Sequence, residues 1–518
     1  MIIYQVYPRS FSDSNNDGIG DLAGIGSKLR YIKSLGCDAL WISPFFKSPI
    51  KDFGYDVSDY REVDPMFGTM DDFRTLLYQA KKLDLGIIVD MVLSHTAEEH
   101  TWFKQSRDRQ NDKTDWYLWA NADPDGSPPN NWLSVFGGPA WRWDAERRQY
   151  YFHSFLSSQP DLNMHNPAVQ QQVLADMKFW LDIGVSGFRF DASNHIFQDR
   201  HLRSNPPRDD TSKALHPYGF QKHLYDQGQP ETLAFLERIR TLLDEYGAYS
   251  LAEVGGHDAL GLMGQYTQPN RLHSAYSFSM MGPDSTAQHV RQVISTLESS
   301  IEAPGMPCYA LSNHDKPRVA TRWANGRNLA DTAKAMFAML TMMRGDICLY
   351  QGEELGLPET RVPFEHLQDP YGKNFWPKFK GRDGCRTPMP WTSAAHGGFS
   401  ETEPWLPVDA EHIPLNVDAQ ESDSTSMLHF ARKLLAFRRG SPALTSGAIA
   451  LHDAEEGVLA FTRHTADQQL LCFFNMDIMG KVVSFPGCGT SVISQRAFID
   501  GSTITLGVSG FVILEVSP

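Results

Sequence analysis

The chain has few cysteines, and their spacing is irregular. Six cysteines are scattered through 518 residues, and no two of them form a CxxC pair. This excludes the disulfide framework of a small secreted domain, and it excludes a cysteine-based zinc site. The pattern is typical of free thiols in a reducing compartment, so we expect a cytoplasmic protein.

Long apolar runs and an excess of positive charge are also missing. The longest nearly apolar stretch, 335–343, is far shorter than the roughly 20 residues of a membrane-spanning helix. The segment from Met1 to Tyr4 shows no basic region before an apolar run, so we expect no secretory signal. The chain has 62 Asp and Glu against 47 Lys and Arg, a net charge of −15. That balance disfavours nucleic acid or an anionic membrane as partner, because phosphate groups need clustered Lys and Arg.

Most of the chain repeats one unit, a short apolar run followed by a loop and an amphipathic stretch. The apolar runs lack polar alternation, as strands covered on both faces do, and they lie at 2–7, 38–42, 87–92, 187–190, 249–252, 275–278, 306–311 and 347–350. Stretches with helical periodicity lie at 28–35, 70–83, 168–181, 231–246, 328–343 and 427–439. Eight strands that alternate with helices predict an α/β fold, the (β/α)₈ TIM barrel.

Two regions interrupt this rhythm. The region 95–159 has no clean period and is rich in Trp, Asn, Pro and Gly, which indicates a small inserted domain. From residue 447 onward, short strands separated by turn residues predict a C-terminal antiparallel β domain. We therefore predict four segments, namely the first part of the barrel, the insertion, the second part of the barrel and the β domain, at 1–94, 95–165, 166–445 and 446–518.

Acidic residues follow three of the predicted strands. Asp191 follows the fourth strand, Glu253 the fifth and Asp315 the seventh. Active residues of such a barrel lie just after the carboxyl ends of its strands, so these acids are expected at one rim. There, one carboxylate can attack an anomeric carbon while a second, protonated carboxyl donates to the leaving oxygen. Any one of them is equally well explained as a helix N-cap, but three independent caps in this arrangement are much less expected.

Three further polar residues share this predicted rim. Arg189 stands two residues before Asp191 and can hold that carboxylate ionised, while His95 and His314 can donate hydrogen bonds to sugar hydroxyls. A lone arginine or histidine is more often structural, so this interpretation depends on the neighbouring acids. Aromatic residues make up 12% of the chain, which suits a cleft where sugar rings pack on aromatic side chains. The pattern predicts cleavage of a glycosidic bond.

Several sequence blocks occur in order through nearly the whole chain. They are YQVYPRSF at 4–11, DSNNDGIGDL at 13–22, DFGYD at 52–56, QPDLN at 159–163, YQGEE at 350–354 and RTPMPW at 386–391. With these blocks the chain resembles the α-amylase family of retaining α-glycoside hydrolases, and within it the α-glucosidase and oligo-1,6-glucosidase branch. The resemblance implies a barrel with an inserted domain B and a C-terminal domain C.

The resemblance also implies a role for each residue at the rim. It implies that Asp191 is the nucleophile, that Glu253 is the general acid and base, and that Asp315 stabilises the transition state through the 2- and 3-hydroxyls of glucose. The residues implied to hold the terminal glucose are Asp52, Tyr55, His95, Arg189, His314 and Arg382. Among them Tyr55 is implied to be the stacking platform. Arg386 lies in the same block as Arg382 and is the alternative to it.

A loop near the N-terminus is a candidate cation site. Carboxylates and an amide at alternate positions suit a hard cation, and the candidate ligands are Asp13, Asn15, Asp17, the carbonyl of Ile19, and Asp21. An Asx-rich turn is the alternative, and Gly24 stands where a calcium helix-loop-helix would have glutamate. The resembling family carries Ca²⁺ or Mg²⁺ here, so we predict a structural Ca²⁺ or Mg²⁺ and no organic cofactor.

The sequence thus predicts a retaining, exo-acting α-glucosidase that releases glucose from the non-reducing end of short α-glucosides. Expected substrates are maltose, malto-oligosaccharides and sucrose, and the expected state is a monomer or weak homo-oligomer. One alternative is a transglucosylase, oligo-1,6-glucosidase or sucrose-acting relative with the same acids. After Asp315 the sequence Lys-Pro-Arg-Val lacks the arginine-rich loop associated with sucrose isomerisation. A catalytically inactive partner of a transporter is the alternative of another class, and such relatives lose the acids.

Three positions bear on specificity. In the resembling branch, the residue after the nucleophile tends to be Val in enzymes that prefer α-1,6 bonds and Ala or Thr in those that prefer α-1,4 bonds. Here it is Ala192, which predicts a bias towards α-1,4 bonds or sucrose. Ser94 stands where Asn is common, and Met164 where an aromatic residue is frequent. We expect both departures to alter the substrate mouth.

Overall fold

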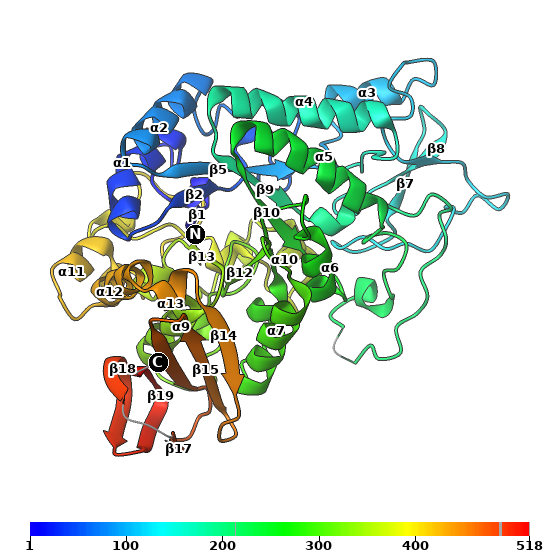
Figure 1. Ribbon diagram of the computed structural model, residues 1–518. Coiled ribbons are helices and arrows are strands. Elements are labelled where there is room, and N and C mark those ends of the chain that lie inside the picture. The colour runs from blue at the N-terminus through cyan, green and yellow to red at the C-terminus, as the bar shows by residue number, and fades with distance from the viewer. Residues whose placement is uncertain (213, 486–488, 517–518) are drawn as a thin grey trace.

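The computed structural model describes residues 1–212, 214–485 and 489–516. Its centre is a closed barrel of parallel strands in the order β1–β13–β12–β11–β10–β9–β5–β2 (Figure 1). These strands are β1 (Ile2–Val6), β2 (Ala39–Ile42), β5 (Gly86–Val92), β9 (Gly187–Asp191), β10 (Tyr249–Val254), β11 (Ser274–Ser277), β12 (Met306–Ala310) and β13 (Asp346–Tyr350). Each overlaps one of the expected strands, so the predicted (β/α)₈ barrel is confirmed.

Helices cover the outside of this barrel (Figure 1). The main ones are α1 (Leu22–Ser34), α2 (Met70–Lys82), α4 (Pro167–Ile183), α5 (Glu231–Tyr246), α6 (Ala259–Tyr266), α7 (Ala287–Ser300), α9 (Leu329–Met342) and α12 (Met427–Gly440). Local sequence sets several of their ends. Thr69 and Asp72 form a capping box at the start of α2, and Gly184 ends α4 with a φ of 110°, which glycine adopts without strain.

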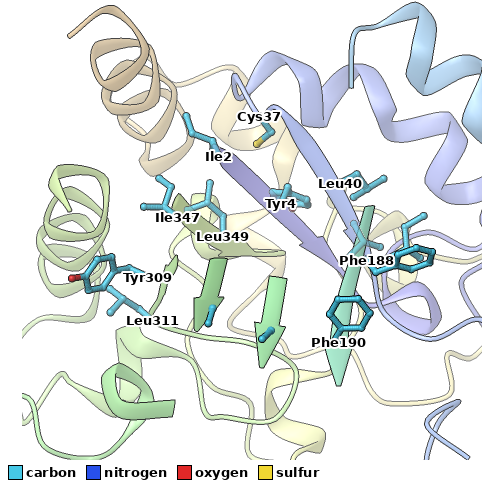
Figure 2. Packing of buried hydrophobic residues seen from close by; sticks show 14 of the residues in the cluster. Ile2, Tyr4, Cys37, Leu40, Phe188, Phe190, Tyr309, Leu311, Ile347 and Leu349 are labelled. Atoms are coloured by element: carbon cyan, nitrogen blue, oxygen red, sulfur yellow. The ribbon is translucent and has the colours of Figure 1, made fainter. Parts of the chain in front are cut away.

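The strands are buried because both of their faces are covered. Side chains such as Ile3 and Trp41 point into the barrel, while Ile2, Tyr4 and Leu40 pack outward against the helices. Figure 2 shows this outer layer, where residues of β1, β2, β9 and β13 pack side by side. This double burial explains why the sequence shows apolar runs without alternation.

The region between β5 and α4 contains a small antiparallel sheet. Its elements are α3 (Thr101–Ser106), β6 (Trp119–Ala120), β7 (Trp141–Asp144) and β8 (Gln149–Phe152), and the sheet order is β6–β8–β7. Trp132, Trp141 and Phe152 belong to a separate hydrophobic cluster there. Bridges from His95 to Asp161 and from Tyr117 to Leu162 tie this region together next to the barrel rim. The exact boundaries of the four predicted segments stay predictions.

The C-terminal region forms the predicted antiparallel sheet. Its strands are β14 (Ala448–His452), β15 (Val458–His464), β16 (Gln469–Asn475), β17 (Lys481–Ser484), β18 (Gly489–Asp500) and β19 (Thr503–Val516). The order is β14–β15–β16–β19–β17, and β18 pairs with β19. We did not predict β18, because most of its side chains are exposed or only half-buried and it carries no apolar run.

The described cysteines are buried, and the described helices are too short or too polar to span a membrane. Five cysteines are buried free thiols, and Cys488 lies outside the described residues. No helix in the described part of the chain combines the length and apolar content that a bilayer crossing requires. A hairpin of β3 (Phe46–Lys47) and β4 (Asp59–Val63) follows β2 and was not predicted.

Candidate active site

Arg189 is the centre of a buried cluster at the carboxyl ends of the barrel strands. Its Nη1 donates to Asp90 Oδ1 at 2.7 Å and to Asp191 Oδ1 at 2.8 Å, and its Nη2 bonds Glu253 Oε2. The hydroxyl of Tyr276 donates to the same Glu253 oxygen at 2.6 Å. One guanidinium therefore positions carboxyls from β5, β9 and β10.

The contacts leave one oxygen of each reacting carboxyl available. Among the described residues, all hydrogen bonds of Asp191 use Oδ1 and all those of Glu253 use Oε2. Asp191 Oδ2 and Glu253 Oε1 are thus the two atoms that can meet a ligand. The predicted nucleophile and general acid are joined through a shared guanidinium.

Three carboxyls around one guanidinium leave an excess of two negative charges if all of them ionise. Burial raises the pKa of Asp191 well above its ordinary value, although Arg189 acts against this rise. Burial likewise raises the pKa of Asp90 to about 6. These shifts favour the protonated forms of Asp191 and Asp90. Arg189 lowers the pKa of Asp191 without outweighing burial, which differs from the expectation that it holds this carboxylate ionised.

Asp315 lies in the opposite electrostatic environment. Its Oδ1 accepts from Arg386 Nη2 at 2.9 Å and from Arg382 Nη1 at 3.2 Å, and His314 Nε2 lies 3.3 Å from Oδ2. Burial acts to raise the pKa of Asp315, but His314, Arg382 and Arg386 outweigh it and hold the pKa below its ordinary value. This carboxylate is ionised and suited to bind hydroxyl donors or to stabilise positive charge.

Tyr55 and His314 form one wall of the site. Their rings stack at 5.4 Å with an angle of 4°, and the Tyr55 hydroxyl lies 2.6 Å from His314 Nε2. The same hydroxyl donates to Asp90 at 3.1 Å. His95 Nε2 contacts the Tyr55 carbonyl at 3.1 Å. An aromatic face held this rigidly suits the apolar side of a sugar ring.

Asp52 and Arg382 close the site on another side. Arg382 Nη2 donates to Asp52 Oδ1 at 2.9 Å and to Asp369 Oδ1 at 2.8 Å. Gln159 Nε2 donates to the second Asp52 oxygen at 3.0 Å. The structure thus brings together all nine predicted catalytic and glucose-holding residues, through contacts that run from Arg189 to Arg382.

Other residues of the site were not predicted. Asp90, Gln159, Tyr276 and Asp369 contact predicted residues, and Arg386 binds Asp315 together with Arg382 rather than replacing it. Asp90 had a usable signal, since it is an acid within the otherwise apolar run 87–92. Asp369 had none, because it lies in a long irregular segment.

Ser94 and Met164, the two departures from the family pattern, lie in different places, one beside a site residue and one in the hydrophobic core. The Ser94 hydroxyl lies 2.9 Å from His95 Nδ1, so it orients the ring of a predicted site residue. Met164 is 1% exposed and belongs to the hydrophobic cluster outside the barrel strands. Ala192 follows Asp191 with a left-handed backbone, at a φ of 39°.

The predicted cation loop is folded by its own hydrogen bonds. Asp13 accepts the backbone N–H groups of Asn16 and Gly18 at 2.7 and 2.8 Å. Asp17 accepts the N–H of Ile19 at 2.9 Å, and Asp21 caps α1. Within the described ranges, no group of three Asp, Glu, His or Cys side chains is arranged to hold a metal ion. The cation stays a prediction.

Comparisons with known proteins agree in one family. The sequence model of the alpha-amylase catalytic domain matches residues 5–447. A probable alpha-glucosidase of Rhizobium meliloti (strain 1021) is 50% identical over 488 residues, which cover 92% of this chain and 88% of the relative. An oligo-1,6-glucosidase of Parageobacillus thermoglucosidasius is 35% identical over 524 residues, covering 94% and 91%.

Solved structures agree with these relatives. The alpha-glucosyl transfer enzyme XgtA has a TM-score of 0.97 and 50% identity, with 99% of this chain and 98% of that chain covered. A mutant of the trehalulose synthase MutB has a TM-score of 0.92 and 31% identity, with 99% of each chain covered. The same fold is therefore found in an alpha-glucosyl transfer enzyme and in a trehalulose synthase.

Proposed function

Because this chain belongs to the alpha-amylase family and is a glycoside hydrolase of the α-glucosidase type, we propose that it removes single glucose units from the non-reducing ends of short α-glucosides. The observation that supports this most strongly is the shared contact of Asp191 and Glu253 with Arg189. Asp191 and Glu253, which we propose as nucleophile and proton donor, both contact this guanidinium, and Asp315 is a separate ionised carboxylate.

The proposed reaction is a double displacement. Asp191 Oδ2 forms a bond to C1 of glucose while the bond from C1 to the leaving oxygen breaks, and that oxygen takes the proton from Glu253 Oε1. Water then enters, Glu253 removes its proton, and the hydroxide displaces Asp191 from C1. Two inversions at C1 give α-glucose. Asp315 balances the positive charge that develops on the sugar between these steps.

The exo action follows from the closed side of the site. Arg382 bridges Asp52, Asp315 and Asp369, and the Tyr55 ring is packed on His314. These contacts between distant segments support a site that is closed beyond the terminal glucose. The test is the product pattern. Maltotriose should release glucose at once, whereas a rapid loss of iodine staining on starch at low conversion would show internal cleavage and exclude this proposal.

Transfer of glucose to a sugar acceptor is the second candidate. XgtA, a transfer enzyme, is 50% identical to this chain. Both reactions proceed through the same glucosyl-enzyme, and they differ only in whether water or a sugar hydroxyl reaches C1. The ratio of free glucose to new oligosaccharide at rising maltose concentration separates them. Transfer should make this ratio fall as maltose rises, and the absence of new oligosaccharide at high maltose would favour hydrolysis alone.

Two smaller proposals accompany the activity. We propose a Ca²⁺ or Mg²⁺ at the loop 13–21, supported by the alternating Asp13, Asn15 and Asp17 side chains, which share one turn. We also propose a cytoplasmic location, supported by the buried free thiols among the described cysteines. The proposed substrates are maltose, malto-oligosaccharides and sucrose.

A further inference from the structure

The pair of Asp191 and Glu253 has two unlike sides. Tyr55, Asp315 and the arginines enclose the side that would hold the terminal glucose. The other side begins at Gly255, two residues beyond Glu253. The backbone N–H of Gly255 donates to Asn194 Oδ1 at 2.9 Å. A Cβ atom at Gly255 would lie 3.6 Å from that oxygen and 4.0 Å from the Phe278 ring. A Cβ atom at Gly255 would thus make only ordinary van der Waals contacts with Asn194 and Phe278, two residues beyond the proposed proton donor.

Lys316 reaches the same region from another strand end. It directly follows Asp315, and its Nζ lies 4.6 Å from the centroid of the Phe278 ring. Phe278 in turn packs edge-on against Tyr276, which holds Glu253. The ammonium is thus connected to Glu253, the proposed proton donor, through the rings of Phe278 and Tyr276.

The Lys316 ammonium differs from the other cations of the site. Arg189, Arg382 and Arg386 each bind a carboxylate. The Lys316 side chain is half-buried, and its ammonium contacts the Phe278 ring. In the described part of the chain, this ammonium has no hydrogen bond or ion pair. Burial lowers its pKa, while Asp315 and Glu253 act in the opposite sense. A half-buried ammonium without an acceptor gains from any ligand oxygen that reaches it.

We propose that Lys316 is a specificity-determining residue that donates a hydrogen bond to the sugar bound beyond Glu253, either the leaving sugar or the acceptor. The Phe278 ring would pack against the C–H face of that sugar. This inference rests on the proposed function. It predicts that Lys316 distinguishes leaving groups that carry hydroxyls from leaving groups that lack them.

The experiment compares two substrates with the same glucose and different leaving groups. Maltose has a sugar leaving group, and p-nitrophenyl α-glucoside has an aromatic one without sugar hydroxyls. Lys316→Met keeps the aliphatic stem and removes the charge. We expect its kcat/KM for maltose to fall about tenfold or more, the effect of losing a charged hydrogen bond, while kcat/KM for the nitrophenyl substrate changes less than about threefold. Lys316→Arg should restore part of the maltose activity.

The matched control is Lys28→Met. Lys28 also lies over an aromatic ring, with Nζ 4.3 Å from the Trp391 ring, but it belongs to α1, away from the site. It should leave both substrates unaffected. Equal losses on both substrates in Lys316→Met would overturn the proposal, because they indicate a role in the shared glucosyl-transfer step. An unchanged maltose rate would overturn it as well. A wild-type enzyme inactive on both substrates would instead refute the proposed function.

Discussion

Arg189 holds the two reacting carboxyls with different nitrogens of one guanidinium, and its side chain is fully buried. A buried arginine of this kind is stable only because Asp90, Asp191 and Glu253 surround it. Burial, and after it the repulsion among these carboxyls, raises the pKa of Asp191. The chemistry of this site therefore depends on individual atoms, and single substitutions should separate binding, proton transfer and folding.

Asp191→Asn should remove the nucleophile while preserving the contact with Arg189, because the amide oxygen can still accept from Nη1. We expect kcat on p-nitrophenyl α-glucoside to fall by about 10⁴-fold or more, with little change in melting temperature. Asp244→Asn is the control, since Asp244 pairs with Arg240 on the exposed surface of α5 at 2.6 Å. Early product from the wild type should be α-glucose by NMR, and β-glucose would contradict the nucleophile assignment.

Ala192→Val should change both specificity and stability. A β-branched residue beside the attacked carbon narrows the space for a secondary-hydroxyl linkage, so the ratio of isomaltose to maltose hydrolysis should rise, by a factor equivalent to ~1–3 kcal/mol at most. The φ of 39° at Ala192 adds strain for valine, so unfolding free energy should drop by about 1 kcal/mol or more. Wild-type enzyme that hydrolyses isomaltose faster than maltose would contradict the α-1,4 preference.

At the scale of elements, residues that cap the first turns of helices also contact the neighbouring loops. Asp21 caps α1 by accepting the N–H of Gly24, and it also accepts the hydroxyl of Ser14 from the predicted cation loop. Asn166 caps α4, where the chain returns to the barrel after the inserted sheet. Each cap fixes the direction in which a neighbouring loop leaves its helix.

The loop 13–21 offers a test that separates capping from cation binding. Asp21→Ala should lower the free energy of unfolding by about 1 kcal/mol when both proteins are measured in chelator, because it removes the cap. Asp17→Asn keeps the fold of the loop but weakens a cation ligand. If the loop binds Ca²⁺ or Mg²⁺, chelation should lower the melting temperature of the wild type and have a smaller effect on Asp17→Asn. Identical melting curves with and without chelator, and no metal by elemental analysis, would exclude the cation.

At the scale of the whole molecule, folding buries several carboxyls and changes their pKa values, which the sequence alone does not indicate. Burial raises the pKa of Asp56 to about 6 and of Glu353 and Glu359 to about 7. Glu353 accepts the backbone N–H of Tyr350 at the end of β13 and faces Arg318 and Glu354. Such groups couple the stability of the entire fold to pH.

Stability should fall as pH rises from about 4.5 to 7. In this window the unfolded chain loses the proton of Glu353, whereas the folded chain retains it, so unfolding becomes more favourable as pH rises. Glu353→Gln should remove on the order of 2–3 kcal/mol of this dependence, measured as the difference in urea unfolding free energy between pH 5 and pH 7.5. Glu245→Gln, at an exposed position of α5, is the control. An unchanged pH dependence in Glu353→Gln would contradict the raised pKa.

The sequence by itself determined the barrel, because its strands are apolar runs and its helices have caps and amphipathic faces, which are local properties. It also indicated Asp191, Glu253 and Asp315, since acids at strand ends are visible without any contact information. Strand β18 was not predicted, because most of its side chains are exposed or half-buried and its sequence has no apolar pattern.

Only the tertiary structure decided which distant residues meet. Arg382 reaches Asp52 across 330 positions of sequence, and Asp90 joins Arg189 across 99. Closing the barrel brings these strand ends together, and no periodicity or local motif encodes such a distance. The same closure removes water from the carboxyls, which raises the pKa of Asp191, and it brings Arg382 and Arg386 to Asp315, which lowers the pKa of that carboxyl. The contact of Lys316 with Phe278 is likewise a property of the folded molecule.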